Sequence, residues 1–147
     1  MFRGTCPTRL DDKGRLKIPA DFKHVVDKEF NGRFYITSLD GQVVKLYPMQ
    51  AWEKLEAEVG GKSSSYATRE HFVRKTSQYG QETEMDAQGR LTISDWLREK
   101  FGLKGEVAVI GMWDHLELRL MEQLGQIPDD APAAPAWLEE LLGKKVS

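Results

Sequence analysis

A short segment near the N-terminus, Asp-Asp-Lys-Gly-Arg at 11–15, combines residues that form a tight turn with residues that bind anions. Gly14 can adopt a positive φ that other residues resist, and the Asp11 carboxylate can accept hydrogen bonds from turn N–H groups. The planar guanidinium of Arg15 can bond two acceptors of a guanine at once, whereas Lys13 is better suited to a phosphate. The segment therefore predicts a turn that presents a DNA-reading arginine at the edge of a sheet.

The same turn also has a purely structural interpretation, in which the Asp11 carboxylate pairs with Arg15 inside the turn. The sequence contains a second copy of the pattern, with Asp86, Gly89 and Arg90 in the equivalent places. The duplication does not decide between the two interpretations, because both turns could be needed for folding.

The two turns belong to a longer internal repeat. Five of thirteen positions are identical in its best-matching segment, where chance gives roughly one identity. The aligned segments are 11–23 with 86–98, 32–36 with 105–109, and 44–47 with 116–119. Their offset drifts from 75 to 73 to 72 residues, as expected when loops between fixed elements change length. The repeat predicts two halves packed about a pseudo-twofold axis.

Each copy predicts the same order of elements: a strand, the turn, a second strand, a helix and two further strands. Pro19 is suited to open the first of these helices, and Ser94 is suited to cap the second. The later strands are expected at 33–38, 43–47, 106–112 and 116–120, and two helices between the copies at 51–59 and 66–79. These elements predict a mainly β protein with helices, in the α+β class.

The predicted organisation has four parts. They are a first repeat at 1–62, a linking helix at 63–80, a second repeat at 81–125 and an acidic tail at 126–147. The tail contains an amphipathic piece beginning at Trp137 that is expected to form a short helix. The four tryptophans of the chain are interpreted as core or subunit contacts.

The charge distribution favours the first turn as the DNA-binding one. The formal net charge of −2 argues mildly against nucleic-acid binding. However, residues 1–17 carry a local balance of +3 and residues 121–147 a balance of −3. Gln88 and Glu84 make the second turn less basic, so Arg90 ranks below Arg15. The candidate DNA-binding residues are Lys13, Arg15, Arg3, Arg9, Lys17 and Arg90, and the turn-forming residues are Asp11, Gly14, Asp86 and Gly89.

Other chemistry finds little support in the sequence. His24, His71 and His115 do not form a metal-binding spacing, and no glycine-rich phosphate loop occurs. We therefore expect no catalytic residue, metal, cofactor or small-molecule substrate. The single cysteine, Cys6, and the lack of a signal peptide or an apolar membrane-spanning run favour a cytoplasmic protein.

Several segments together resemble the MraZ family over roughly residues 1–120. They are Met1-Phe-Arg-Gly, Asp11-X-Lys-Gly-Arg-Leu-X-Ile-Pro19, Leu46-Tyr47-Pro48 with Trp52-Glu53, Arg74, Asp86-X-Gln-Gly-Arg-Leu-X-Ile, and Leu116-Glu-Leu. The resemblance implies two AbrB-like swapped-hairpin halves that form a double-split β-barrel.

The resemblance also implies a function. It suggests a nucleoid-associated bacterial transcriptional regulator that acts as a ring homo-oligomer. Its expected partner is double-stranded DNA with tandem G-rich repeats upstream of its own division and cell-wall gene cluster. A ring would repeat a weak basic patch and so offset the net charge. The alternative is an antitoxin-like AbrB-type module that acts mainly through a protein partner, but such proteins usually carry one barrel half per chain.

Overall fold

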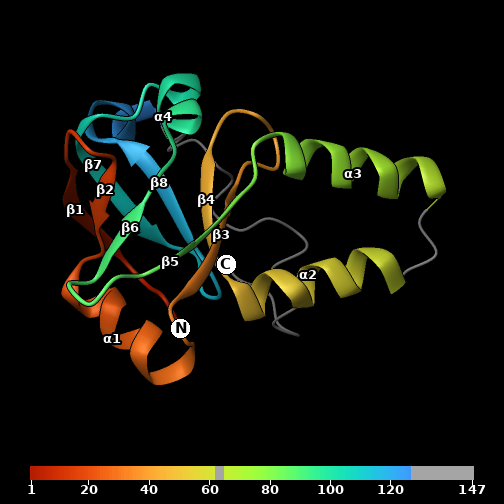
Figure 1. Cartoon of the computed structure of the whole chain (residues 1–147), viewed down its shortest axis with the longest axis horizontal. Helices are drawn as coiled ribbons and strands as arrows, with labels where there is room; N and C mark the ends of the chain where they lie inside the picture. The colour runs from red at the N-terminus through yellow and green to blue at the C-terminus, as the bar shows by residue number, and fades with distance from the viewer. Residues whose placement is uncertain (62–64, 127–147) are drawn as a thin grey trace, which may run out of the picture.

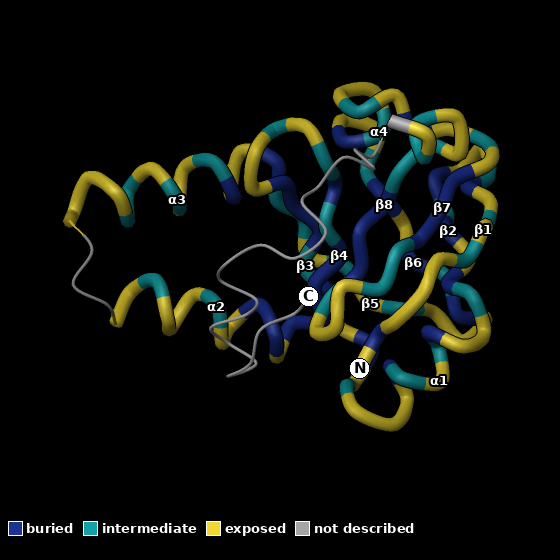
Figure 2. The backbone as a smooth tube through the Cα atoms, turned by 180° about the vertical axis from the view of Figure 1, so that it is seen from behind, coloured by how far each residue is buried: buried dark blue, intermediate teal, exposed yellow. Residues whose placement is uncertain are grey.

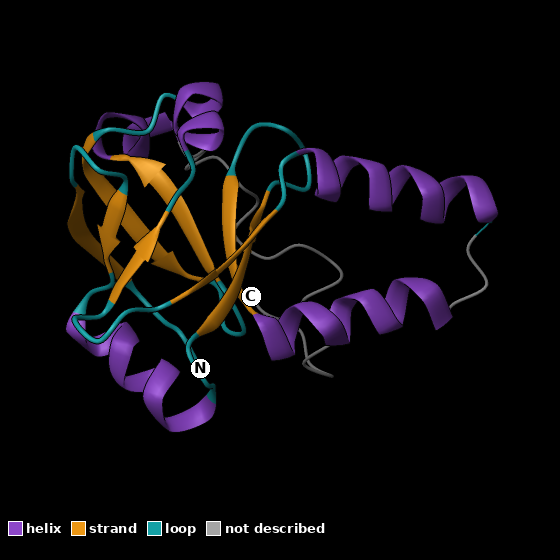
Figure 3. Ribbon diagram, viewed as in Figure 1, coloured by secondary structure: helices purple, strands orange, loops and turns teal. Residues whose placement is uncertain are grey.

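A single antiparallel sheet dominates the computed structural model, which describes residues 1–61 and 65–126 (Figure 1). Its eight strands in the described chain are β1 (Thr5–Leu10), β2 (Arg15–Lys17), β3 (Arg33–Thr37), β4 (Val44–Pro48), β5 (Gln81–Glu84), β6 (Arg90–Thr92), β7 (Gly105–Gly111) and β8 (Leu116–Leu120). The helices are α1 (Ala20–Glu29), α2 (Met49–Gly61), α3 (Tyr66–Gln78), α4 (Asp95–Phe101) and the 3₁₀ helix η1 (Met121–Gln126). The sheet curls into a nearly closed barrel, which confirms the α+β double-split barrel (Figure 3).

The two copies of the repeat interleave in this sheet. The strand order is β5-β3-β4-β8-β7-β1-β2-β6, so β1 pairs with β7, and β3 pairs with β5. The equivalent strands β2 and β6 lie antiparallel, with Leu16 opposite Leu91. The side chain of Gln81 links the two edge strands, since its amide donates to the Thr92 carbonyl at 3.1 Å and its oxygen accepts from the Ser94 N–H at 2.9 Å.

The barrel interior follows the alternation that the sequence predicts (Figure 2). Leu16, Ile18, Leu91 and Ile93 are fully buried on the inner side of β2 and β6 and just beyond them. Each such side chain stabilises the fold by roughly 1.5–3 kcal/mol relative to an exposed one. Since side chains alternate along a strand, their neighbours must point outward.

Helices close the two ends of the barrel, and α2 and α3 extend away from it on the side opposite to β1 and β2 (Figure 1). Ser94 caps α4 as predicted, because its hydroxyl accepts from the Leu97 N–H at 3.3 Å. Helix α2 is longer than the predicted 51–59 at both ends. It begins directly after β4 because Met49 packs in the cluster around Trp52, and its last residues include Gly60. The helix predicted near Trp137 lies outside the described residues.

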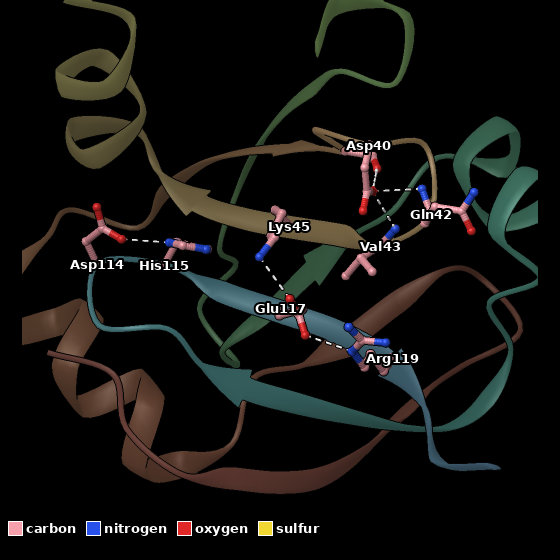
Figure 4. Close-up of polar contacts among 9 residues, drawn as sticks. Asp40, Gln42, Val43, Lys45, Asp114, His115, Glu117 and Arg119 are labelled. Carbon is pink, nitrogen blue, oxygen red and sulfur yellow. Dashed lines mark hydrogen bonds and ion pairs between the residues drawn. The ribbon is translucent and has the colours of Figure 1, made fainter. Parts of the chain in front are cut away.

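Charge is divided between the two copies where their strands meet. Three cross-strand positions pair a basic residue of the first copy with an acidic residue of the second: Lys45 with Glu117, Arg9 with Glu106, and Arg33 with Glu84. The Lys45 Nζ lies 2.8 Å from Glu117 Oε1, and Glu117 also accepts from Arg119 Nε at 2.7 Å (Figure 4). Because Lys45 and Glu117 are equivalent in the repeat, two identical halves would bring like charges together here.

Candidate nucleic-acid interface

The first turn is held together by the side chain of its leading aspartate. The Gly14 N–H donates to the Asp11 carbonyl at 3.0 Å, with φ +81° at the glycine. Asp11 Oδ1 accepts from the backbone N–H of Lys13 at 3.0 Å and of Arg15 at 2.8 Å. Asp11 Oδ2 accepts from Arg15 Nε at 2.7 Å. The Asp–Arg pair of the structural interpretation is therefore present, and it also fixes where the guanidinium lies.

The second turn repeats this arrangement bond for bond. The Gly89 N–H donates to the Asp86 carbonyl at 3.0 Å, with φ +76° at the glycine. Asp86 Oδ1 accepts from the N–H groups of Gln88 and Arg90 at 2.9 and 3.0 Å. Asp86 Oδ2 accepts from Arg90 Nε at 2.9 Å. The hydrogen bonding does not distinguish the two turns, so any functional difference must come from the side chains around them.

Both turn aspartates are set up to stay ionised. Hydrogen bonds, led by the one from the backbone of Arg15, hold the pKa of Asp11 below its ordinary value, and Arg90 has the same effect on the pKa of Asp86. In the described part of the chain, each guanidinium forms its hydrogen bond through Nε alone. The side chains of Arg15 and Arg90 are 34% and 28% exposed. Each turn therefore orients an arginine and leaves its terminal nitrogens available to a ligand.

The two arginines lie on one outer face formed by β2 and β6. Arg15 lies opposite Thr92, and Lys17 lies opposite Arg90. Arg15 and Arg90 lie on neighbouring strands and are offset by two residues along them. Their Cα atoms are therefore about 8 Å apart. We call this surface the ribbon face and define it by Arg9, Arg15, Lys17, Arg90 and Thr92.

Arg9 and Lys17 extend the ribbon face across β1. The pairing of Leu10 with Leu16 places Arg9 beside Lys17, and Thr8 Oγ1 donates to the Lys17 carbonyl at 2.6 Å. The Lys17 ammonium donates to the Gln88 carbonyl at 2.6 Å, within the second turn. In the sequence Lys17 belongs to the basic cluster of the first turn, but β2 carries it to the second. The second turn therefore has more positive charge around it than its own residues supply.

The remaining candidates occupy different places. Lys13 is exposed in the first turn, next to the ribbon face. Arg3 lies before the start of β1, where its guanidinium contacts Met1 Sδ at 3.8 Å. The hydrogen bond from the N-terminal amine lowers the pKa of Glu29, and Arg3 adds a smaller effect in the same direction. About 13 Å of extended strand separates Thr5, the first residue of β1, from Arg9, and Arg3 lies two residues before Thr5. The structure thus gathers five of the six candidates and leaves Arg3 apart.

Two tryptophans outside the residues that define the ribbon face carry exposed apolar surface. Trp96 on α4 is 56% exposed, and Trp113 in the β7–β8 hairpin is 66% exposed, whereas Trp52 is buried. Trp113 has a φ of +69°, an unfavourable conformation for a bulky residue. The hairpin and α4 lie at opposite ends of the barrel (Figure 1). Large exposed side chains of this kind are typical of protein interfaces.

His115 lies in the same hairpin and is engaged within the fold. Its ring stacks on Tyr47 with centroids 4.2 Å apart, and its Nδ1 lies 2.6 Å from an Asp114 carboxylate oxygen (Figure 4). Burial lowers the pKa of His115 below its ordinary value. Within residues 1–61 and 65–126, no three His, Cys, Asp or Glu side chains are grouped so that they could hold a metal ion. None of the described helices is long and apolar enough to cross a membrane.

Comparison with known proteins identifies one family. The family model described as "MraZ protein, putative antitoxin-like" matches residues 1–75 and 79–134. A protein of Koribacter versatilis named transcriptional regulator MraZ is 48% identical over 133 residues, which cover 90% of each chain. A protein of the same name from Acidobacterium capsulatum is 44% identical over 86% of each chain. One from Yersinia pestis is 33% identical over 96% of this chain and 94% of its own.

Proposed function

The chain belongs to the MraZ family, and we propose that it is a sequence-specific DNA-binding transcriptional regulator. The observation that carries this proposal is the ribbon face. It sets two identically built arginine turns at the two ends of one antiparallel strand pair, with Lys17 and Arg9 beside them. The names of the relatives, all regulators of transcription, support the same function.

The geometry of the ribbon face suits the major groove of DNA. The groove admits a two-stranded β-ribbon, and an arginine fork there pairs with both acceptors of a guanine. We assign base reading to Arg15 and Arg90, whose guanidiniums are oriented by Asp11 and Asp86. Lysine suits phosphate as a point charge, so Lys13 and Lys17 would hold the DNA backbone.

We further propose that the protein acts as a ring of identical chains on tandem G-rich repeats upstream of its own division and cell-wall gene cluster, in the bacterial nucleoid. The exposed Trp96 and Trp113 support a ring, because a head-to-tail contact joins two different surfaces of the protomer. A ring would hold several ribbon faces on one DNA, and tandem repeats would engage them together. This repetition compensates for the modest charge of a single face.

The dependence of binding on salt tests this function. Arg9 lies beside Lys17 and is assigned a phosphate contact too. Three phosphate contacts by one protomer would give a slope of about −2.7 for the logarithm of the binding constant against the logarithm of salt concentration. A ring that engages several repeats should give a steeper slope than one repeat alone. Fluorescence anisotropy with duplexes of one, two and four repeats measures both. Binding that is insensitive to salt, or a slope independent of repeat number, would contradict the proposal.

A further inference from the structure

Each turn of the ribbon face rests on a basic residue from the other copy of the repeat. Arg98 of α4 lies against Gly14, where an added Cβ would come within 2.6 Å of Arg98 Nε and 2.8 Å of its Cζ. Lys23 of α1 is the equivalent residue and lies against Gly89, where an added Cβ would come within 2.9 Å of Lys23 Cδ. The absence of a side chain at each glycine is what lets the long basic side chain reach the turn.

Arg98 is joined to the first turn by a chain of hydrogen bonds. Its Nε donates to the Ile93 carbonyl at 3.1 Å, and the Ile93 N–H donates to the Gly14 carbonyl at 2.7 Å. One of its terminal nitrogens pairs with Asp95 on the same helix. The side chain is 21% exposed, so it is largely covered by the contacts that it makes. Helix α4 therefore holds the first turn through the guanidinium of Arg98, which is oriented by the Ile93 carbonyl and by Asp95.

The second turn has a looser support. The Ile18 N–H donates to the Gly89 carbonyl at 2.9 Å, which matches the bond at the first turn. However, the Lys23 ammonium pairs with Asp27 at 2.7 Å, and only its methylene groups approach Gly89. A lysine also lacks a donor in the place of Nε, so it cannot bond the carbonyl as Arg98 does.

We infer that Arg98 is a positioning residue for DNA recognition, which sets the place of the first turn and so of the Arg15 guanidinium. This inference rests on the proposed function. Arg98 acts through Ile93 and Gly14 and does not itself contact DNA. It fixes the first turn more firmly than Lys23 fixes the second, which makes Arg15 the more selective of the two reading arginines.

The test is the conservative substitution Arg98→Lys, which keeps the charge and the stem but removes the Nε donor. Affinity is measured for duplex DNA from upstream of the protein's own gene and for a random duplex of equal length. We expect the affinity for the upstream DNA to fall about tenfold, the effect of losing one hydrogen bond. The affinity for random DNA and the salt slope should stay unchanged, because no phosphate contact is removed. Amide hydrogen exchange should accelerate at Lys13 and Arg15 but not at Gln88 and Arg90.

The control is Lys104→Met, which removes an exposed charge near Arg98 and should affect both duplexes equally and weakly. Unchanged preference of Arg98→Lys for the upstream DNA would overturn the inference, as would an equal loss on both duplexes or an unfolded variant. These outcomes are distinct from failure of the proposed function, which would appear as wild-type protein with no preference for the upstream DNA.

Discussion

Replacing Arg15 with alanine is expected to lower the affinity for the upstream DNA at least about 100-fold. One bidentate contact to guanine contributes roughly 1–3 kcal/mol of discrimination, and a ring loses that contact at every subunit. The fold should persist, because the removed side chain is partly exposed and, among residues 1–61 and 65–126, its guanidinium bonds only Asp11 within its own turn. Anisotropy titrations and size-exclusion chromatography measure affinity and assembly on the same samples.

Two further variants sharpen the Arg15 result. Arg90→Ala should weaken binding less, because its turn lacks the lysine that stands at position 13 of the first. Lys54→Ala removes an exposed positive charge on α2, away from the ribbon face, and should leave the affinity within about twofold. Unchanged DNA binding by Arg15→Ala would refute the assigned site. If wild-type protein binds no DNA but captures a protein partner, the antitoxin-like alternative takes its place.

Replacing Glu117 with glutamine is expected to lower the free energy of unfolding by about 3 kcal/mol, as for other buried ion pairs that lose one partner. The carboxylate is 9% exposed and neutralises both Lys45 and Arg119. Its loss leaves two partly buried cations with no anion between them. Lys45→Met should lower the free energy of unfolding by a smaller amount, because Arg119 still pairs with Glu117. Chemical denaturation of the three proteins measures the difference.

The dependence of stability on pH tests the same interaction of Glu117 with Lys45 and Arg119. Burial acts to raise the pKa of Glu117, but the hydrogen bonds from Lys45 and Arg119 outweigh it and hold the pKa below its ordinary value of 4.5. The ionised Glu117 therefore contributes fully to the free energy of unfolding above pH 4.5. This contribution is lost as the pH falls from there through the lowered pKa of Glu117 in the folded protein. The stability difference between wild-type protein and Glu117→Gln should shrink in acid. An equal difference at pH 7 and pH 3 would contradict this account.

The local features of the fold could be predicted from the sequence because they depend on neighbouring residues. The positive φ of Gly14, the acceptor role of Asp11 and the capping role of Ser94 all act within a few positions. The alternation of buried residues around Leu16 likewise follows from the pleat of a strand. The bounds predicted for α2 were wrong at both ends, and at the N-terminal end the reason is the tertiary packing of Met49, which extends the helix.

Which residues lie on the ribbon face depends on the pairing of strands that are far apart in the sequence. Closeness in the sequence therefore does not predict it. Arg3 and Lys17 both lie near the first turn in the sequence. Extended β1 carries Arg3 away, and β2 delivers Lys17 to the carbonyl of Gln88. The alignment of the repeat did contain two such contacts, since it places Leu16 over Leu91 and Lys45 over Glu117, and equivalent residues meet on a twofold axis.

Three cross-strand charge pairs favour two different halves over two identical ones. The first copy supplies the base and the second the acid at three meeting points of the barrel. At these three points the halves are complementary in charge, whereas on the ribbon face Lys17 lies directly opposite Arg90, a pairing of like charges that is destabilising. Fusion also allows the two turns to differ, with Lys13 in one and Gln88 in the other.

The central claim is that the ribbon face reads DNA at the protein's own control region, and a nuclease footprint of the DNA upstream of its gene tests it most directly. Wild-type protein should protect a series of evenly spaced, short G-rich repeats. Arg15→Ala at the same concentration should leave them open to cleavage. A uniform cleavage pattern with wild-type protein, or the same protected repeats with Arg15→Ala, would contradict the claim.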